Sequence, residues 1–408
     1  MNKKKIFNDP VYGFISLPYD IIFDLIEHPF FQRLRRIRQL GLTHLVYPGA
    51  LHTRLHHALG SLHLMVQAVE TLRSKGHEIT EEESKAVCIA ILLHDIGHAP
   101  FSHALENSLV TGISHEHISL LFMEELNKQF NGELTMAIRI FKDEYPKHFL
   151  HNLVSSQLDM DRLDYLNRDS FYTGVLEGKI GAQRIIKMLN IHNDQLVVEE
   201  KGIYSIEKFI VARRLMYWQV YLHKTVLAAE QLLVKIMQRA KELSAKNNAL
   251  FASPVLQYFL HQEITGKDLK EVSHLIQYAK LDDYDIFGAV KVWSENDDLI
   301  LSRLCNGIVN RNLYKIKLQK EPFDEQWLKS MLLKAGQLYK LSPEEAAYFS
   351  FNGDISNSAY DPKDEQIKIL FKDGSLKELT EESDQMDVSV LIRPVHKYFW
   401  CYFPELLS

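Results

Sequence analysis

The stretch His94-Asp-Ile-Gly-His-Ala-Pro-Phe-Ser-His103 decides how the rest of this chain is interpreted. The run before it, Val87 to Leu93, is apolar on every side, which predicts a buried helix. Adjacent side chains of a helix point about 100° apart, so His94 and Asp95 can share a ligand only where the helix ends. Gly97 is the residue that would end it. Titratable side chains at the end of a buried helix are costly unless they are paired or bound to a metal. The stretch therefore predicts either a hydrogen-bonded, capped pair or a metal site.

Two further segments offer ligands that would complete a metal site. They are Arg54-Leu-His-His-Ala-Leu-Gly60 and Leu158-Asp-Met-Asp-Arg-Leu-Asp-Tyr165. An imidazole from the first and a carboxylate from the second would join the pair at the helix end. Mixed imidazole and carboxylate ligands with open positions suit one Mn, Fe, Ni, Mg or Zn ion. Such an ion lowers the pKa of bound water and neutralises phosphoryl oxygens. The complete candidate set is His57, His94, Asp95 and Asp161.

Histidines crowd the region that follows the helix end. Of the 19 histidines in the chain, five fall between residues 94 and 117. A capped pair explains two polar residues at a helix end, but surplus histidines bring no advantage in packing. The crowd therefore favours a catalytic metal centre over the capped pair. Its members are His94, His98, His103, His115 and His117.

The composition is that of a soluble globular protein. Of the 408 residues, 46% are apolar and 25% are charged, and the formal net charge is -6. This charge argues against a general polyanion-binding surface, so a nucleic-acid partner is not expected. The three cysteines, Cys88, Cys305 and Cys401, lack CxxC spacing, which argues against a disulfide framework or a thiolate zinc site. No apolar run is long enough to span a bilayer. We expect a cytoplasmic protein without a membrane partner.

Hydrophobic periodicity predicts a helical body that is followed, after Asn312, by a small α+β tail. A hairpin or arm is expected before the first helix. The expected helices cover about 19–40, 54–73, 80–93, 115–128, 132–144, 158–170, 181–191, 205–245 and most of 252–308, with a small hairpin at 196–204. In the tail, strands are expected at 314–318, 348–351, 367–371 and 388–392, with a hairpin turn at Asp373-Gly374 and a helix at 324–340.

The three segments together resemble the HD-domain phosphohydrolase superfamily, and more closely its deoxynucleoside triphosphate triphosphohydrolase (dNTPase) branch. The resemblance runs from about Phe7 to Leu233 and covers over half of the chain. It implies a mainly α fold with an HD-domain helical body and a small C-terminal α+β subdomain. The matching motifs, in the family's order, are Asn8-Asp-Pro, Phe31-Gln-Arg-Leu-Arg, Gln39-Leu-Gly, Tyr47-Pro-Gly-Ala and the His94 to His103 stretch. The expected units are an arm and first helix at 1–50, the HD catalytic domain at 51–245, a helical extension at 246–310 and the subdomain at 311–408.

The resemblance implies that the chain hydrolyses a dNTP to deoxynucleoside and triphosphate, by attack of water at the α-phosphate. It makes the two histidines and two aspartates above the metal ligands. His103, His115 and Glu116 match family positions around the α-phosphate. The leaving 5′ oxygen needs a general acid, and an imidazole with a near-neutral pKa suits that task. We assign it to His115, with Glu116 as its orienting partner; Asp95 is also counted among the catalytic residues. Ser119 occupies the last place of a would-be HExxH motif, so a zinc-peptidase interpretation fails.

The resemblance also implies a set of substrate residues. Three arginines match cationic positions that hold the triphosphate. Two tyrosines and an aspartate match positions that read the deoxyribose, because a ring against C2′ excludes a ribose hydroxyl and a carboxylate accepts from the 3′-OH. Taken alone, each arginine would be interpreted as a solvated charge and each tyrosine as a core aromatic. The set comprises Arg54, Arg162 and Arg213 for the phosphates, Tyr165, Tyr221 and Asp169 for the sugar, and Gln39 near both.

The basic run Arg33, Arg35, Arg36, Arg38 is too dense for one face of an amphipathic helix. Its simplest interpretation is a helix with a solvated, charged side. The alternative is an activator site at a subunit interface, since relatives bind activating nucleotides there and form homo-oligomers (dimers or tetramers). However, an Asp that reads guanine in the animal enzyme is replaced here by a Glu. The candidate activator residues are Lys5, Glu27, Gln32 and Arg35.

Several rival functions remain after the sequence is considered. Other HD enzymes hydrolyse cyclic dinucleotides, alarmones or nucleoside monophosphates, but the cyclic-dinucleotide branch carries a GYP signature and a Lys where this chain has His98. Gly174 to Lys179 misses the spacing of a phosphate-binding Walker loop. A phosphodiesterase or nuclease is disfavoured by the acidic net charge. A nucleotide-binding regulatory module with weak catalysis is disfavoured by the intact set of candidate ligands.

Overall fold

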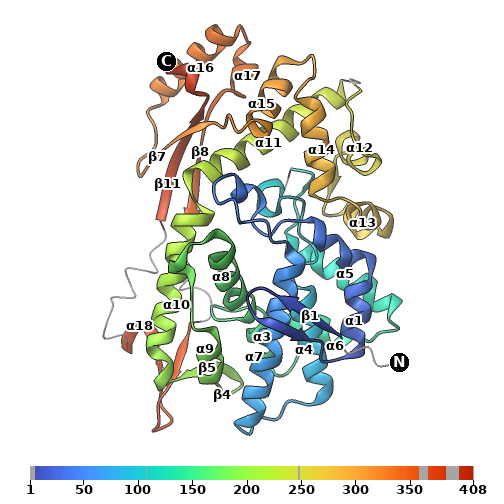
Figure 1. Cartoon of the computed structure of the whole chain (residues 1–408), viewed down its shortest axis with the longest axis vertical. Coiled ribbons are helices and arrows are strands. Elements are labelled where there is room, and N and C mark those ends of the chain that lie inside the picture. The colour runs from blue at the N-terminus through green and yellow to red at the C-terminus, as the bar shows by residue number, and fades with distance from the viewer. Residues whose placement is uncertain (1–4, 107, 247–248, 358–365, 383–394, 408) are drawn as a thin grey trace.

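The computed structural model describes residues 5–106, 108–246, 249–357, 366–382 and 395–407 (Figure 1). A mainly α-helical body carries small sheets, and the C-terminal portion mixes helices and strands. The expected fold class is therefore confirmed. Within the described ranges, no helix has the length and apolar character that crossing a membrane requires.

The N-terminal segment forms the expected hairpin, and the first expected helix is broken. Strands β1 (Ile6–Asp9) and β2 (Gly13–Ser16) pair antiparallel. Residues 19–40 then form α1 (Asp20–Glu27), α2 (Pro29–Gln32) and the 3-10 turn η1 (Arg33–Arg36) in place of one helix. Pro29 explains the break, because the residue before a proline avoids helical geometry and proline itself suits the first position of a new helix.

Three long helices form the centre of the body. They are α3 (Arg54–Ser74), α4 (Glu81–Leu93) and α8 (Met160–Thr173). Thr80 and Glu83 make a capping box at the start of α4, and residues 86–93 of that helix are buried throughout. A Cβ on Gly60 would lie 2.0 Å from Oδ1 of Asp164, so glycine at this position allows α3 and α8 to approach closely.

Shorter elements cover this centre. Helix α7 was not expected, and the hairpin after α9 lies earlier than predicted. Its turn is Asn193 and Asp194, both left-handed (φ 48 and 61), a conformation that these two residue types tolerate. Residues 200–202, which were expected in the hairpin, form the turn η5 before the next helix. The elements are α5 (His115–Gln129), α6 (Thr135–Phe141), α7 (His148–Val154), α9 (Ala182–Met188), β4 (Leu189–His192) and β5 (Gln195–Glu199).

The expected single helix at 205–245 is wrong. It divides into α10 (Ile203–Met216), a π-helical turn (Tyr217–Tyr221) and α11 (Lys224–Ala245). His223 caps the new helix with its ring accepting from the backbone N–H of Thr225 at 3.2 Å. π-turns occur mostly at functional sites, and this one carries Tyr221.

The helical extension and the tail complete the chain. Helices α12 (Pro254–His261), α13 (Val272–Tyr278), α14 (Asp283–Trp293) and α15 (Leu299–Val309) form the extension, and a short parallel pair joins β3 (Val110–Thr111) to β6 (Ile264–Thr265). The tail contains β7 (Lys315–Gln319), α16 (Glu325–Tyr339), α17 (Pro343–Ala346), β8 (Ser350–Asn357), β9 (Lys368–Leu370), β10 (Leu376–Glu378), α18 (Leu379–Glu382) and β11 (Val395–Tyr402).

The strands of the tail belong to two different sheets. Strands β7, β11 and β8 form an antiparallel sheet beside α11, and the β9–β10 hairpin extends β4–β5 through a parallel pairing of β9 with β5. Figure 1 shows β7, β8 and β11 in the upper part of the view and β4 and β5 in the lower part. The expected turn at Asp373-Gly374 is confirmed, with Gly374 at φ 84. The expected strand at 388–392 lies outside the described residues.

Candidate metal centre and active site

Three helices bring the four candidate metal ligands together. Oδ1 of Asp161, at the start of α8, lies 3.0 Å from Nε2 of His57 on α3 and 3.5 Å from Nε2 of His94. Asp95 completes the group, with Oδ2 3.6 Å from Nε2 of His57 and Oδ1 3.5 Å from Nε2 of His94. His94 and Asp95 directly follow α4, so the end of the helix lets adjacent side chains converge.

The two imidazoles are oriented as metal ligands. The buried Nε2 atoms of His57 and His94 face the Asp161 carboxylate, but no contact within the described ranges gives either atom the geometry of a hydrogen bond. Their other ring nitrogens are engaged: Nδ1 of His57 lies 2.7 Å from Oδ2 of Asp164, and Nδ1 of His94 lies 2.6 Å from the carbonyl oxygen of Ile91. Metal-binding histidines commonly donate their second N–H to a carboxylate or a carbonyl in this way. The residues present therefore fit a divalent cation.

The charges around this point favour a cation. Burial opposes a positive charge on His57, but the Asp161 and Asp164 carboxylates raise the pKa of His57 to about 10. Burial works against ionised Asp161 as well, yet the two imidazoles hold its pKa well below its usual range. The pKa of buried Asp95 is also lowered, by His94 and then by Arg54. A divalent metal bound among these ionised carboxylates would be the largest local charge in the site and would offset their mutual repulsion.

The carboxylate of Asp164 contacts the candidate ligand His57 but is not itself a candidate ligand. Its replacement therefore tests the predicted metal site without removing a ligand. Asp164→Asn keeps the shape of the side chain but removes the charge that orients His57. Because loss of such an outer partner weakens metal binding by about 10–100-fold, we expect that decrease in metal affinity, measured by competition with a chelating dye. A variant with unchanged affinity would show that Asp164 does not act on the metal.

A second group of side chains lies beside the metal ligands. Asp95, His98 and His115 place one ligand atom each within 4.8 Å of one another. The rings of His98 and His115 stack at a centroid distance of 3.9 Å and 19°, and Nε2 of His98 lies 3.3 Å from Oδ1 of Asp95. Burial, and then the charge of Arg54, lower the pKa of His98 well below its usual value, so this ring is neutral.

Glu106 is the hydrogen-bonding partner of the candidate general acid. Oε1 of Glu106 lies 3.0 Å from Nδ1 of His115, whereas Oε1 of the expected partner, Glu116, lies 3.9 Å from Nε2. No spacing pattern marks Glu106 in the sequence, because it lies in an irregular loop. His103 lies in η3 (Ser102–Leu105), but its side chain is outside the part of the chain that the structure describes.

The three arginines expected to hold phosphates are partly or wholly buried. Arg54 forms an ion pair with Asp95 and donates from Nε to Oγ of Ser102 at 3.0 Å. Arg162 pairs with Asp159, and Arg213 donates to Oε1 of Gln157 at 3.0 Å; in both, the buried Nε has no partner among the residues described. None of the three is a solvated surface charge, and the partners of each fix its guanidinium in place.

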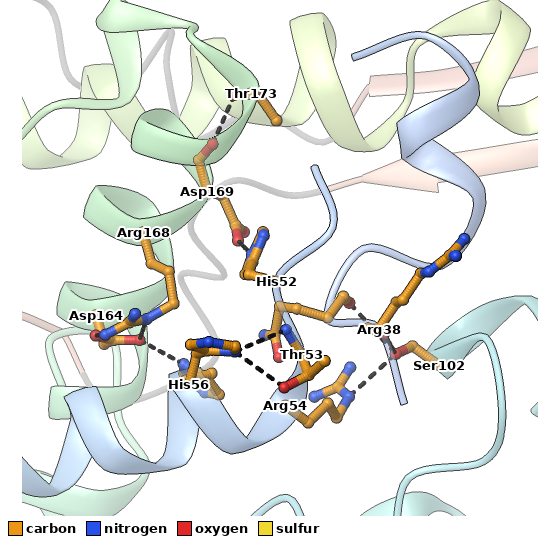
Figure 2. Close-up of polar contacts among 12 residues, drawn as sticks. Arg38, His52, Thr53, Arg54, His56, Ser102, Asp164, Arg168, Asp169 and Thr173 are labelled. Carbon is orange, nitrogen blue, oxygen red and sulfur yellow. Dashed lines mark hydrogen bonds and ion pairs between the residues drawn. The ribbon is translucent and has the colours of Figure 1, made fainter. Parts of the chain in front are cut away.

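Two of the residues expected to bind the sugar, Tyr165 and Asp169, lie on one face of α8 together with Asp161. Asp161, Tyr165 and Asp169 are spaced four residues apart, which places them one turn after another on the same side of a helix. Oδ2 of Asp169 accepts from the hydroxyl of Tyr221 at 2.8 Å, and the rings of Tyr165 and Tyr221 meet edge-on at 6.1 Å. His52 also belongs to this group, although no sequence motif pointed to it: its Nε2 lies 2.8 Å from Oδ1 of Asp169, as Figure 2 shows.

Gln39 lies beside this group. It is buried, its Oε1 has no hydrogen-bond partner in the described ranges, and its backbone N–H donates to the carbonyl oxygen of His52 at 3.0 Å. An unsatisfied buried amide oxygen next to a candidate sugar site is available to a ligand.

The candidate activator residues lie on or beside α1, α2 and η1. Arg35 donates from Nε to Oε1 of Gln32 at 2.8 Å, and Gln32 donates to the carbonyl oxygen of Ile26 at 2.7 Å. Lys5 lies over the ring of Phe23 at 4.1 Å, and Glu27 is exposed at the end of α1.

Arg33 differs from the rest of the basic run. It is completely buried and donates to the backbone oxygens of Leu281 (2.7 Å), Ile96 (3.3 Å) and His98 (2.7 Å). A solvated charge is therefore the wrong interpretation for this residue.

Comparison with known proteins agrees with this geometry. Residues 54–168 match the HD domain family, and residues 180–258 match the HD associated region. A phosphohydrolase of known structure from Bacteroides thetaiotaomicron is 53% identical, with 98% of this chain and 99% of that one covered and a TM-score of 0.94. This chain belongs to the HD-domain phosphohydrolase family. The HD-domain phosphohydrolase described here is related to the dNTPase branch of that family.

Other relatives of this HD-domain phosphohydrolase differ in what is known of them. The uncharacterized protein YwfO of Bacillus subtilis is 33% identical and covers 98% of this chain and 93% of its own. The Dictyostelium discoideum homolog of the deoxynucleoside triphosphate triphosphohydrolase SAMHD1 is 32% identical over 54% of this chain and 46% of its own. The zebrafish (Danio rerio) protein of that name is 27% identical over 76% and 55%. The chain thus spans about half the length of the relatives that carry the dNTPase name.

Proposed function

We propose that this HD-domain phosphohydrolase hydrolyses dNTPs to deoxynucleoside and triphosphate, by attack of water at the α-phosphate. The observation that carries the proposal is the face of α8, with Asp161 in the metal group and Asp169 two turns further on. At about 1.5 Å per residue the two carboxylates are roughly 12 Å apart along the helix. That spacing suits a substrate whose α-phosphate lies at the metal group while its 3′-OH reaches Asp169. The relatives named as dNTP triphosphohydrolases support the same substrate.

Each group has a distinct task in this proposal. A divalent cation held by the four ligands would neutralise phosphoryl oxygens and lower the pKa of the attacking water. His115 donates a proton to the leaving 5′ oxygen, and Glu106 accepts from its Nδ1–H and stabilises the charged ring. The ring of Tyr165 excludes a ribose 2′-hydroxyl. The triphosphate is held by the guanidinium groups of Arg54, Arg162 and Arg213.

Product analysis tests the proposal. Metal-reconstituted protein is incubated with each dNTP and NTP, singly and in pairs, and the nucleoside, triphosphate and diphosphate products are separated. We expect triphosphate and deoxynucleoside from dNTPs only. Orthophosphate release would overturn the proposal, and cleavage of single-stranded DNA faster than dNTP turnover would replace it with a nuclease.

The proposal extends to regulation by a nucleotide in a homo-oligomer. Arg35, Arg36 and Arg38 line a cavity of about 280 Å³ together with the partly exposed rings of Tyr284 and Phe287. Guanidinium groups bind phosphates in bidentate fashion and aromatic rings stack on bases, so this cavity has the chemistry of a nucleotide site. Turnover that rises only when two nucleotides are mixed would support an activator.

The pH dependence of turnover tests the role of Glu106. Burial opposes the charge on His115, but the hydrogen bond with Glu106 and the charge of Asp95 raise its pKa above the usual 6.5. A general acid must be protonated, so turnover persists below the raised pKa and is lost as the pH rises through it. Glu106→Gln removes one of the raising charges, and the alkaline limb of the kcat profile should therefore move to lower pH. Glu116→Gln, measured in parallel, should move that limb less; equal shifts would return the orienting role to Glu116.

A further inference from the structure

A single carboxylate of the helical extension bridges two loops that are far apart in the sequence. Asp283, the first residue of α14, accepts from the backbone N–H of Phe101 with Oδ1 at 2.7 Å and from the backbone N–H of Arg38 with Oδ2 at 2.9 Å. Only 6% of its surface is exposed, so water does not compete for these bonds. Both carboxylate oxygens of this buried residue therefore accept hydrogen bonds from backbone N–H groups.

Both bridged loops carry groups of the active site. Oγ of Ser102 donates to the carbonyl oxygen of Arg38 at 3.0 Å and accepts from Nε of Arg54 at 3.0 Å. Figure 2 shows these three residues converging from separate segments. Arg54 in turn pairs with Asp95, so the position of the two loops determines where this guanidinium lies beside the metal ligands.

The backbone at this point is strained and needs a partner. Phe101 and Ser102 both have left-handed conformations, with φ of 55 and 54. Non-glycine residues keep such conformations only where surrounding contacts impose them. The bond from Phe101 to Asp283 is one such contact. The close approach of Gly41, where a Cβ would lie 3.0 Å from the carbonyl oxygen of Phe101, is another.

The first half of the same loop is held by the neighbouring end of α13. The hydroxyl of Tyr278 donates to the carbonyl oxygen of Gly97 at 2.9 Å. Buried Arg33 joins the carbonyl oxygen of Leu281 to those of Ile96 and His98. The ring of His98 stacks on that of His115, the candidate general acid. These bonds therefore hold the backbone that positions His98 beside His115.

We propose that residues 278–283 are a clamp that positions the active-site loop 96–102, with Asp283 as its main positioning residue. The clamp lies outside both segments that match the family, 54–168 and 180–258. Its catalytic consequence rests on the proposed function, but its effect on the loop does not. Asp283 touches no reacting atom in this scheme; it acts through the backbone of Phe101 and Arg38.

The test compares Asp283→Ala and Asp283→Asn with a matched control in the same extension. Asp298 caps α15 by accepting from the N–H of Leu301 at 2.8 Å and pairs with Arg239, away from the loop. The readouts are hydrogen–deuterium exchange of residues 96–103, metal content, kcat and KM, with Asp298→Asn as the control.

For Asp283→Ala we expect exchange in residues 96–103 to speed up at least tenfold while metal content stays that of the native protein, because the four ligands are untouched. We expect kcat to fall about tenfold or more, with Asp283→Asn intermediate because its amide keeps one acceptor. Asp298→Asn should leave exchange in the loop and turnover unchanged. Native exchange in the loop of Asp283→Ala would overturn the clamp.

Two outcomes of this experiment are decided by a second variant or a second measurement. If Asp283→Ala fails to fold, Tyr278→Phe removes one hydroxyl from the same clamp and should speed exchange around Gly97; unchanged exchange there overturns the proposal. If the native protein turns over no dNTP, the proposed function fails, whereas the exchange measurement still decides the clamp.

Discussion

Replacing Asp161 with alanine is expected to remove the bound metal and to lower turnover by about 10³-fold or more. Asp161 is the only candidate ligand that α8 contributes, and its Oδ1 lies within 3.5 Å of both imidazoles. A metal contributes several kcal/mol to stabilising the charge of a phosphoryl transition state, and about 1.4 kcal/mol corresponds to a factor of ten. The metal content of the purified variant and its kcat are the measurements.

The exposed carboxylate Asp297 supplies the control for this experiment. Asp297→Ala should retain both metal and turnover. Normal metal content in Asp161→Ala would show that the metal is bound elsewhere. A variant that loses the metal but keeps turnover would show that the hydrolysis does not depend on it.

The second large effect is expected on stability, from Arg168→Met. Arg168 is completely buried and donates to Oδ2 of Asp164 at 2.9 Å and to Oδ2 of Asp9 at 2.7 Å. Methionine fills similar space but leaves two buried carboxylates without their cation. Removing one partner of a buried ion pair costs about 3–5 kcal/mol. We expect a decrease of that size in the free energy of unfolding, measured by urea denaturation.

Arg73→Met is the matched control for this loss. Arg73 is about one-third exposed and pairs with Glu81 at 2.8 Å, and exposed pairs contribute about 0–1 kcal/mol. A loss below 1 kcal/mol for Arg168→Met would contradict the role given to the buried network. Because Asp164 also orients His57, the same variant should bind metal more weakly than the native protein.

The sequence predicted the convergence of His94 and Asp95 because that part of the signal is local. Thr80 and Glu83 set the start of α4, and Gly97 follows the two ligands at its end, so the convergence of His94 and Asp95 follows from helix geometry alone. The five histidines between residues 94 and 117 then favoured a catalytic site. The turn at Asp373-Gly374 was predicted for the same reason, since two residues decide a hairpin turn.

Breaks within helices were less accessible to sequence reasoning. The π-turn at Tyr217–Tyr221 has no glycine or proline to mark it, and the apolar periodicity runs through it. The turn carries Tyr221, whose contacts with Asp169 and Tyr165 join segments that are far apart in the sequence. The hairpin expected at 196–204 lies instead at β4–β5, because Asn193 and Asp194 adopt the left-handed turn.

By itself the sequence determined the helical body and the convergence of His94 and Asp95, because these depend on spacings of a few residues; the resemblance to the family supplied the expected roles of Tyr165 and Asp169 on α8. The tertiary structure decided which groups orient the active-site residues. Glu106 orients His115 from an irregular loop, and the carbonyl oxygen of Leu281 meets Arg33 across 248 positions. Nothing in the local spacing of Arg33 marks it as buried. A charge is buried only where distant backbone supplies its acceptors, and the fold alone brings those acceptors to it.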